Sequence, residues 1–209
     1  MKNNNNNIFW ISYSDLMTSL FFIMLVLFVV TISFLQYHDK NIKEKLNKID
    51  ELQTAIKKLP QNYFVYQPQY KRFKLIEQIQ FASKESIIDK KYYPYLFNVG
   101  MSINNLIDSL HSNEKYKNFD IKYLVVIEGR ASSFKYSRNF ELSYERALSL
   151  YIFWKNNFKD KILFNPNYCE IQIAGSGTDG IKEFSGEEEY KNQQFLIHIV
   201  PKIGKILEK

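Results

Sequence analysis

The sequence is poor in the residues that build disulfide frameworks, metal centres and catalytic sites. Its 209 residues include one cysteine, Cys169, and three histidines. One cysteine excludes an intramolecular disulfide and a cysteine-rich metal site, and the histidines have no metal-ligand or catalytic spacing. The sequence also lacks a glycine-rich phosphate loop and a nucleophile elbow. We therefore expect a protein that is not an enzyme and that holds neither a metal nor an organic cofactor.

Arginine is scarce as well, although the formal net charge is +6. A nucleic-acid surface usually concentrates its basic residues, whereas the lysines here are scattered along the chain. We expect solvated lysine-rich faces and no nucleic-acid partner. The arginines are Arg72, Arg130, Arg138 and Arg146.

Charge is almost absent from residues 8–34, where Asp15 is the single acidic or basic side chain. At about 1.5 Å per residue, a helix over this range can cross a hydrocarbon core of about 30 Å. The sequence predicts a transmembrane helix over 8–34, after a short cytoplasmic tail at 1–7. A signal peptide is the alternative, but the apolar run is too long and no small-x-small cleavage site follows it.

The polar residues of this segment recur at three- and four-residue steps, which places Ser12, Asp15, Thr18 and Ser19 on one helix face. A carboxylate inside a membrane costs on the order of 2.5–3.5 kcal/mol, so it usually faces a partner helix or a water-filled path. Asp15, Thr18 and Ser19 are the candidate ion-translocating residues. The alternative is that Asp15 lies near the helix end and reaches the lipid headgroups.

Residues 35–70 are expected to form an amphipathic helical linker, which could also act as a plug. Within 39–59 the apolar residues follow steps of three and four, typical of an amphipathic helix or a short coiled coil with one break in the heptad register. This pattern favours a parallel homodimer. Pro60 ends the helix, residues 61–70 read as an irregular connector, and the domain boundary falls near residue 70. The apolar residues are Ile42, Leu46, Ile49, Leu52, Ile56 and Leu59.

Four lysines follow the apolar segment and one precedes it. A count of positive charge alone would place the C-terminal side in the cytoplasm, although long domains translocate largely regardless of charge. The lysines are Lys2 on one side and Lys40, Lys43, Lys45 and Lys48 on the other.

Beyond residue 70 the pattern predicts an α/β (α+β) domain of βαβαββ order over 71–203, with a tail at 204–209. Alternating strand and helix patterns favour helices on one face of a mixed sheet. The expected strands are 74–82, 122–128, 169–174 and 194–201, and the expected helices are 92–111 and 137–158.

Several short motifs of this region resemble the OmpA-like peptidoglycan-binding domain. They are Ile127-Glu128-Gly129, the NxxLSxxRA motif from Asn139 to Ala147, Ala174-Gly175-Ser176-Gly177 and Asn192-Gln193-Gln194-Phe195. The NxxLSxxRA motif is the most specific of them. The resemblance extends over about residues 70–203.

The membrane segment resembles a narrower group, through Trp10-Ile11-Ser12-Tyr13-Ser14-Asp15-Leu16-Met17-Thr18 and then Phe21-Phe22. This motif is similar to the membrane segment of the B subunits of ion-driven motors. These B subunits include flagellar stator subunits of the MotB type and ZorB of the Zorya anti-phage system. These subunits combine an acid-bearing helix with an OmpA-like domain.

The resemblance implies roles for single residues. Asp15 matches the ion-carrying aspartate, Arg146 matches the arginine that pairs with a carboxylate of the peptidoglycan stem peptide, and Asn139 matches the motif asparagine near that site. The chain departs from the family where Gly-His-Thr-Asp is usual, because it reads Gly129-Arg130-Ala131-Ser132. Ser132 therefore replaces an expected aspartate, and Asn192-Gln193-Gln194 replaces the usual Asn-Arg-Arg.

The resulting hypothesis is an ion-driven motor subunit of the bacterial inner membrane, with a cytoplasmic N-terminus and a periplasmic domain. It would form a homodimer inside a ring of a multi-pass A-type subunit (MotA- or ZorA-like, a pentamer), transport protons or sodium ions, and bind peptidoglycan through a weakened motif. The Zorya-type defence motor is preferred over a flagellar stator. A passive OmpA-like wall anchor and, at lower rank, an energy-transducing subunit of the ExbD type are the alternatives.

Overall fold

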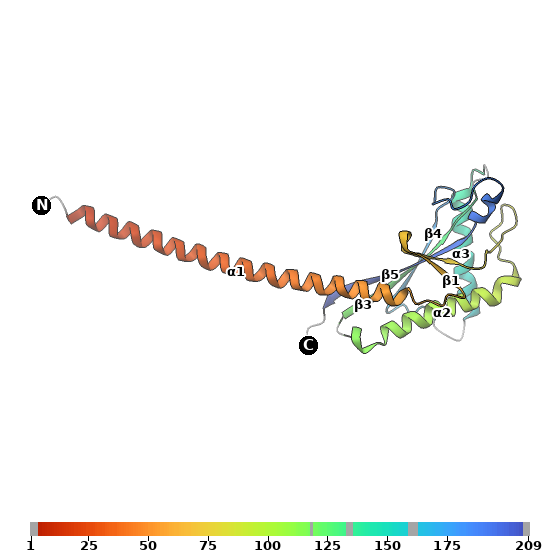
Figure 1. Ribbon diagram of the computed structural model, residues 1–209, viewed down its shortest axis with the longest axis horizontal. Helices are drawn as coiled ribbons and strands as arrows, with labels where there is room; N and C mark the ends of the chain where they lie inside the picture. Colours follow the sequence, from red (N-terminus) through yellow and green to blue (C-terminus); the bar gives the residue numbers. More distant parts are fainter. Residues whose placement is uncertain (1–3, 118, 133–135, 159–162, 207–209) are drawn as a thin grey trace. The chain divides into compact units, whose positions relative to one another are not determined.

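The chain divides into two compact units, residues 1–48 and 49–209. The computed structural model describes residues 4–117, 119–132, 136–158 and 163–206. Helix α1 (Asn4–Ile56) makes up the described part of the first unit and continues into the second (Figure 1). It begins at Asn4, inside the stretch that was expected to be a tail.

The first unit exposes a long run of apolar side chains. Its most apolar 18-residue window has a mean hydropathy of 2.6, and none of that window is buried. The hydroxyls of Thr31 and Ser33 donate to the carbonyls of Leu27 and Val29, four residues earlier, at 2.7 and 2.9 Å. Such bonds satisfy polar side chains within the helix itself, which suits an apolar environment.

The second unit is built on a mixed five-stranded sheet in the order β1-β2-β5-β3-β4. β3 and β4 run parallel, and the other neighbouring pairs run antiparallel. The mixed sheet with helices confirms the expected α+β class, with one more strand than predicted. The strands are β1 (Phe64–Gln67), β2 (Arg72–Leu75), β3 (Phe119–Gly129), β4 (Cys169–Gly175) and β5 (Phe195–Ile206).

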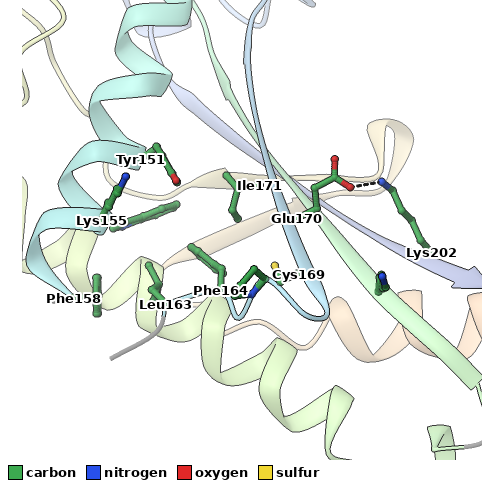
Figure 2. Close-up of a pocket in the computed structure, with 12 residues that line it drawn as sticks. Tyr151, Lys155, Phe158, Leu163, Phe164, Cys169, Glu170, Ile171 and Lys202 are labelled. Atoms are coloured by element: carbon green, nitrogen blue, oxygen red, sulfur yellow. Dashed lines mark hydrogen bonds and ion pairs between the residues drawn. The ribbon is translucent and has the colours of Figure 1, made fainter. Parts of the chain in front are cut away.

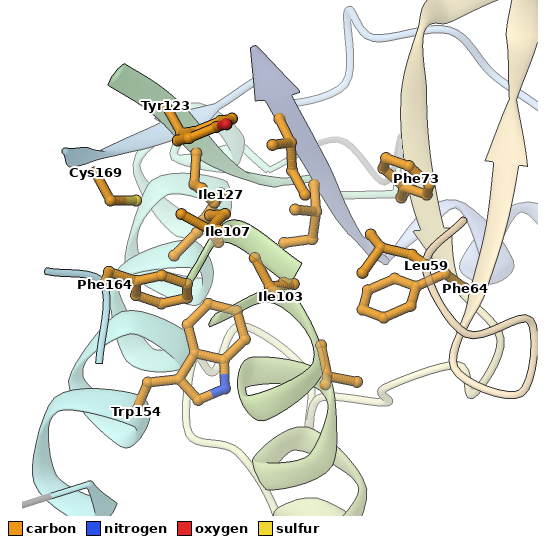
Figure 3. Packing of buried hydrophobic residues seen from close by; sticks show 14 of the residues in the cluster. Leu59, Phe64, Phe73, Ile103, Ile107, Tyr123, Ile127, Trp154, Phe164 and Cys169 are labelled. Carbon is orange, nitrogen blue, oxygen red and sulfur yellow. The ribbon is translucent and has the colours of Figure 1, made fainter. Parts of the chain in front are cut away.

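The helices α2 (Tyr93–His111) and α3 (Asn139–Asn157) pack on one face of this sheet. Along β3, buried residues alternate with more exposed ones, as expected for a strand with one covered face. Figure 3 shows Ile103 and Ile107 of α2, Trp154 of α3 and Ile127 of β3 in one buried cluster. The indole Nε1–H of Trp154 donates to the carbonyl of Leu96 at 2.8 Å and so links the two helices.

Four short 3-10 helices complete the described elements. They connect the strands and helices and give the loops local hydrogen bonds. Their bounds are η1 (Pro68–Tyr70), η2 (Lys90–Tyr92), η3 (Glu114–Tyr116) and η4 (Gly186–Asn192).

The second unit starts earlier in the chain than residue 70. β1 lies inside the expected connector, and Leu52, Ile56 and Leu59 are 0–3% exposed in the core of this unit. These three side chains are therefore unavailable to a coiled-coil seam, which leaves Ile42, Leu46 and Ile49 for one. The coiled-coil prediction over 39–59 was too long because an apolar face packs equally well against its own domain.

Two strand ends also differ from the prediction. The strand expected at 74–82 ends at Leu75 in the structure, and the chain from Ile76 to Asp89 has no regular secondary structure. β5 runs to Ile206, past the expected domain end at 203. The alternating apolar residues at 75–81 predicted a strand, but the chain after Leu75 forms a loop whose Ile79 is buried in the core.

Candidate functional site

The polar face of α1 is present as predicted from the spacing. In an α-helix the side chains of Ser12, Asp15, Thr18 and Ser19 lie within an arc of roughly 120°, and all four are exposed. The Thr18 hydroxyl donates to the carbonyl of Ser14 at 2.7 Å. This bond fixes the side chain beside Asp15 and leaves the Thr18 oxygen able to accept from a second partner.

Within the described part of the chain, α1 is the one helix long and apolar enough to cross a membrane by length and composition. The structure thus places Asp15 on the exposed surface of an apolar helix, near its N-terminal end.

Arg146 lies on the buried side of α3 and is 2% exposed. Its Nε–H donates to the backbone carbonyl of Glu85 at 3.0 Å, and its guanidinium lies over the ring of Phe81 at 4.5 Å. Among the described residues no carboxylate forms an ion pair with it, and its Nη1 has no hydrogen-bond partner. Burial lowers the pKa of Arg146 to about 10, so the side chain is still charged at neutral pH.

Ser132 lies just beyond β3 and is 5% exposed. The side-chain amide of Gln193 donates to the Ser132 hydroxyl at 2.8 Å. The preceding backbone is fixed by two bonds, from Arg130 N–H to the Gln194 carbonyl at 3.1 Å and from Ala131 N–H to the Gly177 carbonyl at 3.0 Å. A neutral hydroxyl–amide pair thus occupies the position where the family resemblance led us to expect an acid.

Asn139 is the first residue of α3, and its backbone N–H donates to the carbonyl of Tyr136 at 3.3 Å. α3 passes very close to the end of β3, because a Cβ at Gly129 would lie 2.0 Å from the carbonyl oxygen of Ser143. Arg146 lies about one turn further along α3. The start of α3, Arg146 and the end of β3 therefore border the same end of the sheet.

A second group of buried charges was not predicted from the sequence as a site. Arg130 and Arg72 are 2% and 4% exposed. Arg72 Nε donates to the Gln67 side-chain oxygen at 2.8 Å, and its Nη2 lies 3.8 Å from the carboxylate of Glu183. Burial, followed by the nearby charge of Arg72, lowers the pKa of Arg130. The unusual Gly129-Arg130 sequence was the one signal that could have identified this group.

The same charged group continues along the sheet to Glu128 and His198, whose side chains are 2.8 Å apart. Burial disfavours the Glu128 carboxylate, but hydrogen bonds from His198 and Ser176 outweigh this effect and lower the pKa of Glu128. Glu183 is likewise hydrogen-bonded, to Lys74 at 2.6 Å and to Gln67 at 2.8 Å. The bonds of Glu183 hold the loop between β4 and β5 against the sheet, which is a structural role.

One described cleft is separate from the predicted residues. It has a volume of about 700 Å³ and lies between α3 and the start of β4, as Figure 2 shows with Tyr151, Lys155, Phe164 and Ile171. Cys169 also lines it, and burial raises the pKa of this thiol to about 12. Such a thiol is protonated at neutral pH and is a poor nucleophile. None of the six predicted site residues lines the cleft.

No cluster of three or more metal-ligating side chains occurs within 4–117, 119–132, 136–158 and 163–206. The predicted site residues fall into two groups: those on the polar face of α1 around Asp15, and Arg146, Ser132 and Asn139 in the second unit.

The second unit belongs to the class of α+β domains with two helices on one face of a mixed sheet. No protein-family model matches the chain, and no curated protein matches its sequence. Several solved structures are similar to parts of it at low identity.

Three of these structures illustrate the similarity. The C-terminal domain of Helicobacter pylori MotB is 14% identical, with 58% of this chain and 83% of that chain covered and a TM-score of 0.39. A putative MotB-like protein from Desulfovibrio vulgaris is 10% identical, with 79% and 98% covered and a TM-score of 0.44. The peptidoglycan-associated lipoprotein of Burkholderia pseudomallei is 11% identical, with 59% and 88% covered and a TM-score of 0.36.

Proposed function

We propose that this chain is the single-pass subunit of an ion-driven rotary motor in the bacterial inner membrane, with its sheet domain anchored to the cell wall. The observation that carries the proposal is Asp15, a carboxylate on the polar face of a helix that is otherwise apolar and exposed. Such an acid in a membrane needs a partner or a water-filled path. A ring of a multi-pass A-type subunit around two copies of α1 would supply both.

In this mechanism Asp15 binds and releases a proton or a sodium ion, and the hydroxyls of Thr18 and Ser19 line the same path. Ion entry down the membrane potential releases roughly 2.3 kcal/mol per charge per 100 mV. Alternate charging and neutralisation of Asp15 changes how strongly it is attracted to the surrounding ring. That change can drive a stepwise rotation.

The sheet domain would resist the resulting torque by binding peptidoglycan in the periplasm. Arg146 is the residue suited to a stem-peptide carboxylate, because its planar guanidinium can donate two parallel hydrogen bonds. Asn139 and Ser132 border the same end of the sheet. Since Ser132 is neutral and already bonded to Gln193, binding here would rely on the carboxylate contact more than on an ammonium contact.

Within this class we favour a Zorya-type anti-phage motor over a flagellar stator of the MotB type. The reasons are the DLMTSLFF motif and the short connector between the membrane segment and the sheet domain. A passive wall anchor is the rival from a different class. It would use the same domain with a membrane helix in which Asp15 has no role.

The test replaces Asp15 with Asn, which keeps the shape of the side chain and removes its ability to carry a charge. Asp39→Asn is the matched control, because Asp39 lies on the same helix beyond the apolar segment. We expect Asp15→Asn to lower function at least 100-fold. Function is measured as protection of cells from phage plaques or as swimming in soft agar. Copurification with the multi-pass partner should be unchanged, and Asp39→Asn should retain both properties.

Full function of the Asp15→Asn variant would contradict the ion-carrier role. If no multi-pass protein copurifies with the wild-type chain and Asp15→Asn is silent, the passive anchor is correct.

A further inference from the structure

The contacts of Arg146 come from a loop of its own chain. Residues 79–85, which we call the strap, lie between β2 and α2 and have no regular secondary structure. The strap is fixed at one end by Ile79, which is 1% exposed in the core, and by a bond from Gln80 N–H to the Tyr92 hydroxyl at 3.3 Å. Its other end makes a tight turn from Ala82 to Glu85, closed by a backbone bond of 3.1 Å.

The strap contacts the Arg146 guanidinium at two places that a ligand could otherwise use. The Phe81 ring covers a face of the guanidinium at 4.5 Å, and the Glu85 carbonyl accepts from Nε at 3.0 Å. A single carbonyl is a weak substitute for a carboxylate, which can accept two parallel charge-assisted bonds. Nη1 is buried without a partner among the described residues. The closed arrangement thus leaves a donor of Arg146 unsatisfied, and an anionic ligand would satisfy it.

The strap also has features that allow it to move. Lys84 adopts a left-handed backbone conformation with φ of 62°, which is unfavourable for a side chain with a Cβ. Phe81 rests edge-on against Phe195 with ring centroids 5.7 Å apart, and the Lys84 ammonium lies over the Tyr136 ring at 5.4 Å. Phe81 is only partly buried at the edge of the core, and residues 81–85 carry no sheet hydrogen bonds, so side-chain contacts and the bond from Arg146 are what hold this part of the strap.

We propose that the strap is a cover for the Arg146 site, and that a carboxylate ligand binds only when residues 81–85 swing away from the guanidinium. The carboxylate then replaces the Glu85 carbonyl and satisfies Nη1. This inference rests on the proposed wall-binding function for the identity of the ligand. The closed state itself is inferred from the contacts of Phe81 and Glu85 with Arg146 and does not depend on that function. Wall attachment is thereby a regulated step, weak while the strap is closed.

The first experiment measures the closure without any ligand. Phenylglyoxal, which modifies accessible arginines, is applied to the full-length chain in detergent, and each arginine is followed by peptide mass spectrometry. Arg138, whose side chain is 58% exposed, should react quickly, whereas Arg146 should be protected. In Phe81→Ala we expect Arg146 to react at least 10-fold faster. Arg72 and Arg130 should stay protected, which shows that the domain is still folded.

The matched control is Phe97→Ala. Phe97 is a partly exposed aromatic residue of α2 that stacks on Phe158, away from the strap. It should leave Arg146 protected. Wild-type Arg146 that reacts as fast as Arg138, or unchanged protection in Phe81→Ala, would overturn the cover.

The second experiment measures binding of the full-length chain to purified peptidoglycan sacculi by sedimentation. We expect Phe81→Ala to bind at least 10-fold more tightly than the wild type, and Phe81→Ala combined with Arg146→Gln to lose this gain. Equal Arg146-dependent binding by the wild type and Phe81→Ala would overturn the cover and leave the wall anchor intact. An accessible Arg146 in Phe81→Ala without any binding to sacculi would instead overturn the wall anchor and leave the cover standing.

Discussion

The two units of this chain differ in the surroundings of their candidate charged side chains. In the first unit Asp15 lies exposed on an apolar helix, beside hydroxyls whose bonds are made within the helix. In the second unit several charged side chains are buried or partly buried and held by the same chain, as Glu128 is by His198 and Arg146 is by Glu85. Under the proposed function, the exposed Asp15 meets a partner outside the chain. A buried charge in the second unit has a structural explanation that must be separated from any ligand.

The difference shows why the two halves of the proposed site need different tests. Substitution of Asp15 should change function and leave folding alone, because Asp15 lies in the first unit and is exposed there. Substitutions of the buried residues should change the stability of the second unit. Cys169, the one thiol of the chain, is 5% exposed, so its labelling by a maleimide in urea reports unfolding of this unit in the full-length protein.

The largest difference is expected between the two tryptophans. Trp154 is fully buried and donates to Leu96, so Trp154→Ala should lower the free energy of unfolding by about 3–5 kcal/mol. Trp10 is 64% exposed in the first unit, and Trp10→Ala should leave the urea midpoint of Cys169 labelling unchanged. A matching loss in Trp10→Ala would break the separation between the units.

A smaller effect is expected at the Glu128–His198 pair. The pKa of Glu128 is lowered in the fold, so its contribution to stability is complete above the ordinary value of 4.5 and is lost as the pH falls through the lowered pKa. Glu128→Gln should cost about 1.5–3 kcal/mol at pH 7, the range for hydrogen bonds to charged groups. It should also flatten the loss of stability below pH 4.5. At these pH values unfolding in urea is followed by near-UV circular dichroism, because a protonated thiol reacts poorly with maleimide, and Asp15→Asn should follow the wild-type pH profile.

The smallest effect is expected at the surface pair of Lys202 and Glu170, which are 2.8 Å apart with about half of each side chain exposed. Water and salt screen such pairs. Glu170→Gln should leave the urea midpoint within experimental error at about 0.1 M and at about 1 M salt, between which the screening length falls from about 10 Å to about 3 Å. A clear, salt-dependent drop would show that exposed charges of the second unit are as important as buried ones.

Much of the second unit could be predicted from local pattern, because α2, α3 and the strands β3, β4 and β5 carry their periodicity in their own residues. β1 was missed because its four residues lie between Pro60 and Pro68, in a stretch whose prolines and aromatics indicate a connector. The domain boundary was misplaced because the apolar face of α1 at Leu52 and Ile56 fits both a coiled coil and a domain core. The pattern alone does not say which surface covers it.

The polar face around Asp15 could be predicted because helical spacing alone defines it. The surroundings of Arg146 could not, since Phe81 and Glu85 are more than 60 residues away in the sequence and meet it through the fold. The motif identified the arginine and gave no sign that the chain covers it. Arg130 likewise gained its structural meaning only when its burial beside Arg72 and Gly180 was known.

The most direct test of the central claim is ion flux through the purified complex of this chain with its membrane partner, reconstituted in liposomes under an imposed membrane potential. Proton- and sodium-sensitive dyes inside the liposomes identify the ion. We expect flux of one of these ions with the wild-type chain and with Asp39→Asn, and its loss with Asp15→Asn. Equal flux with Asp15→Asn, or no flux of either ion with the wild type, would contradict it.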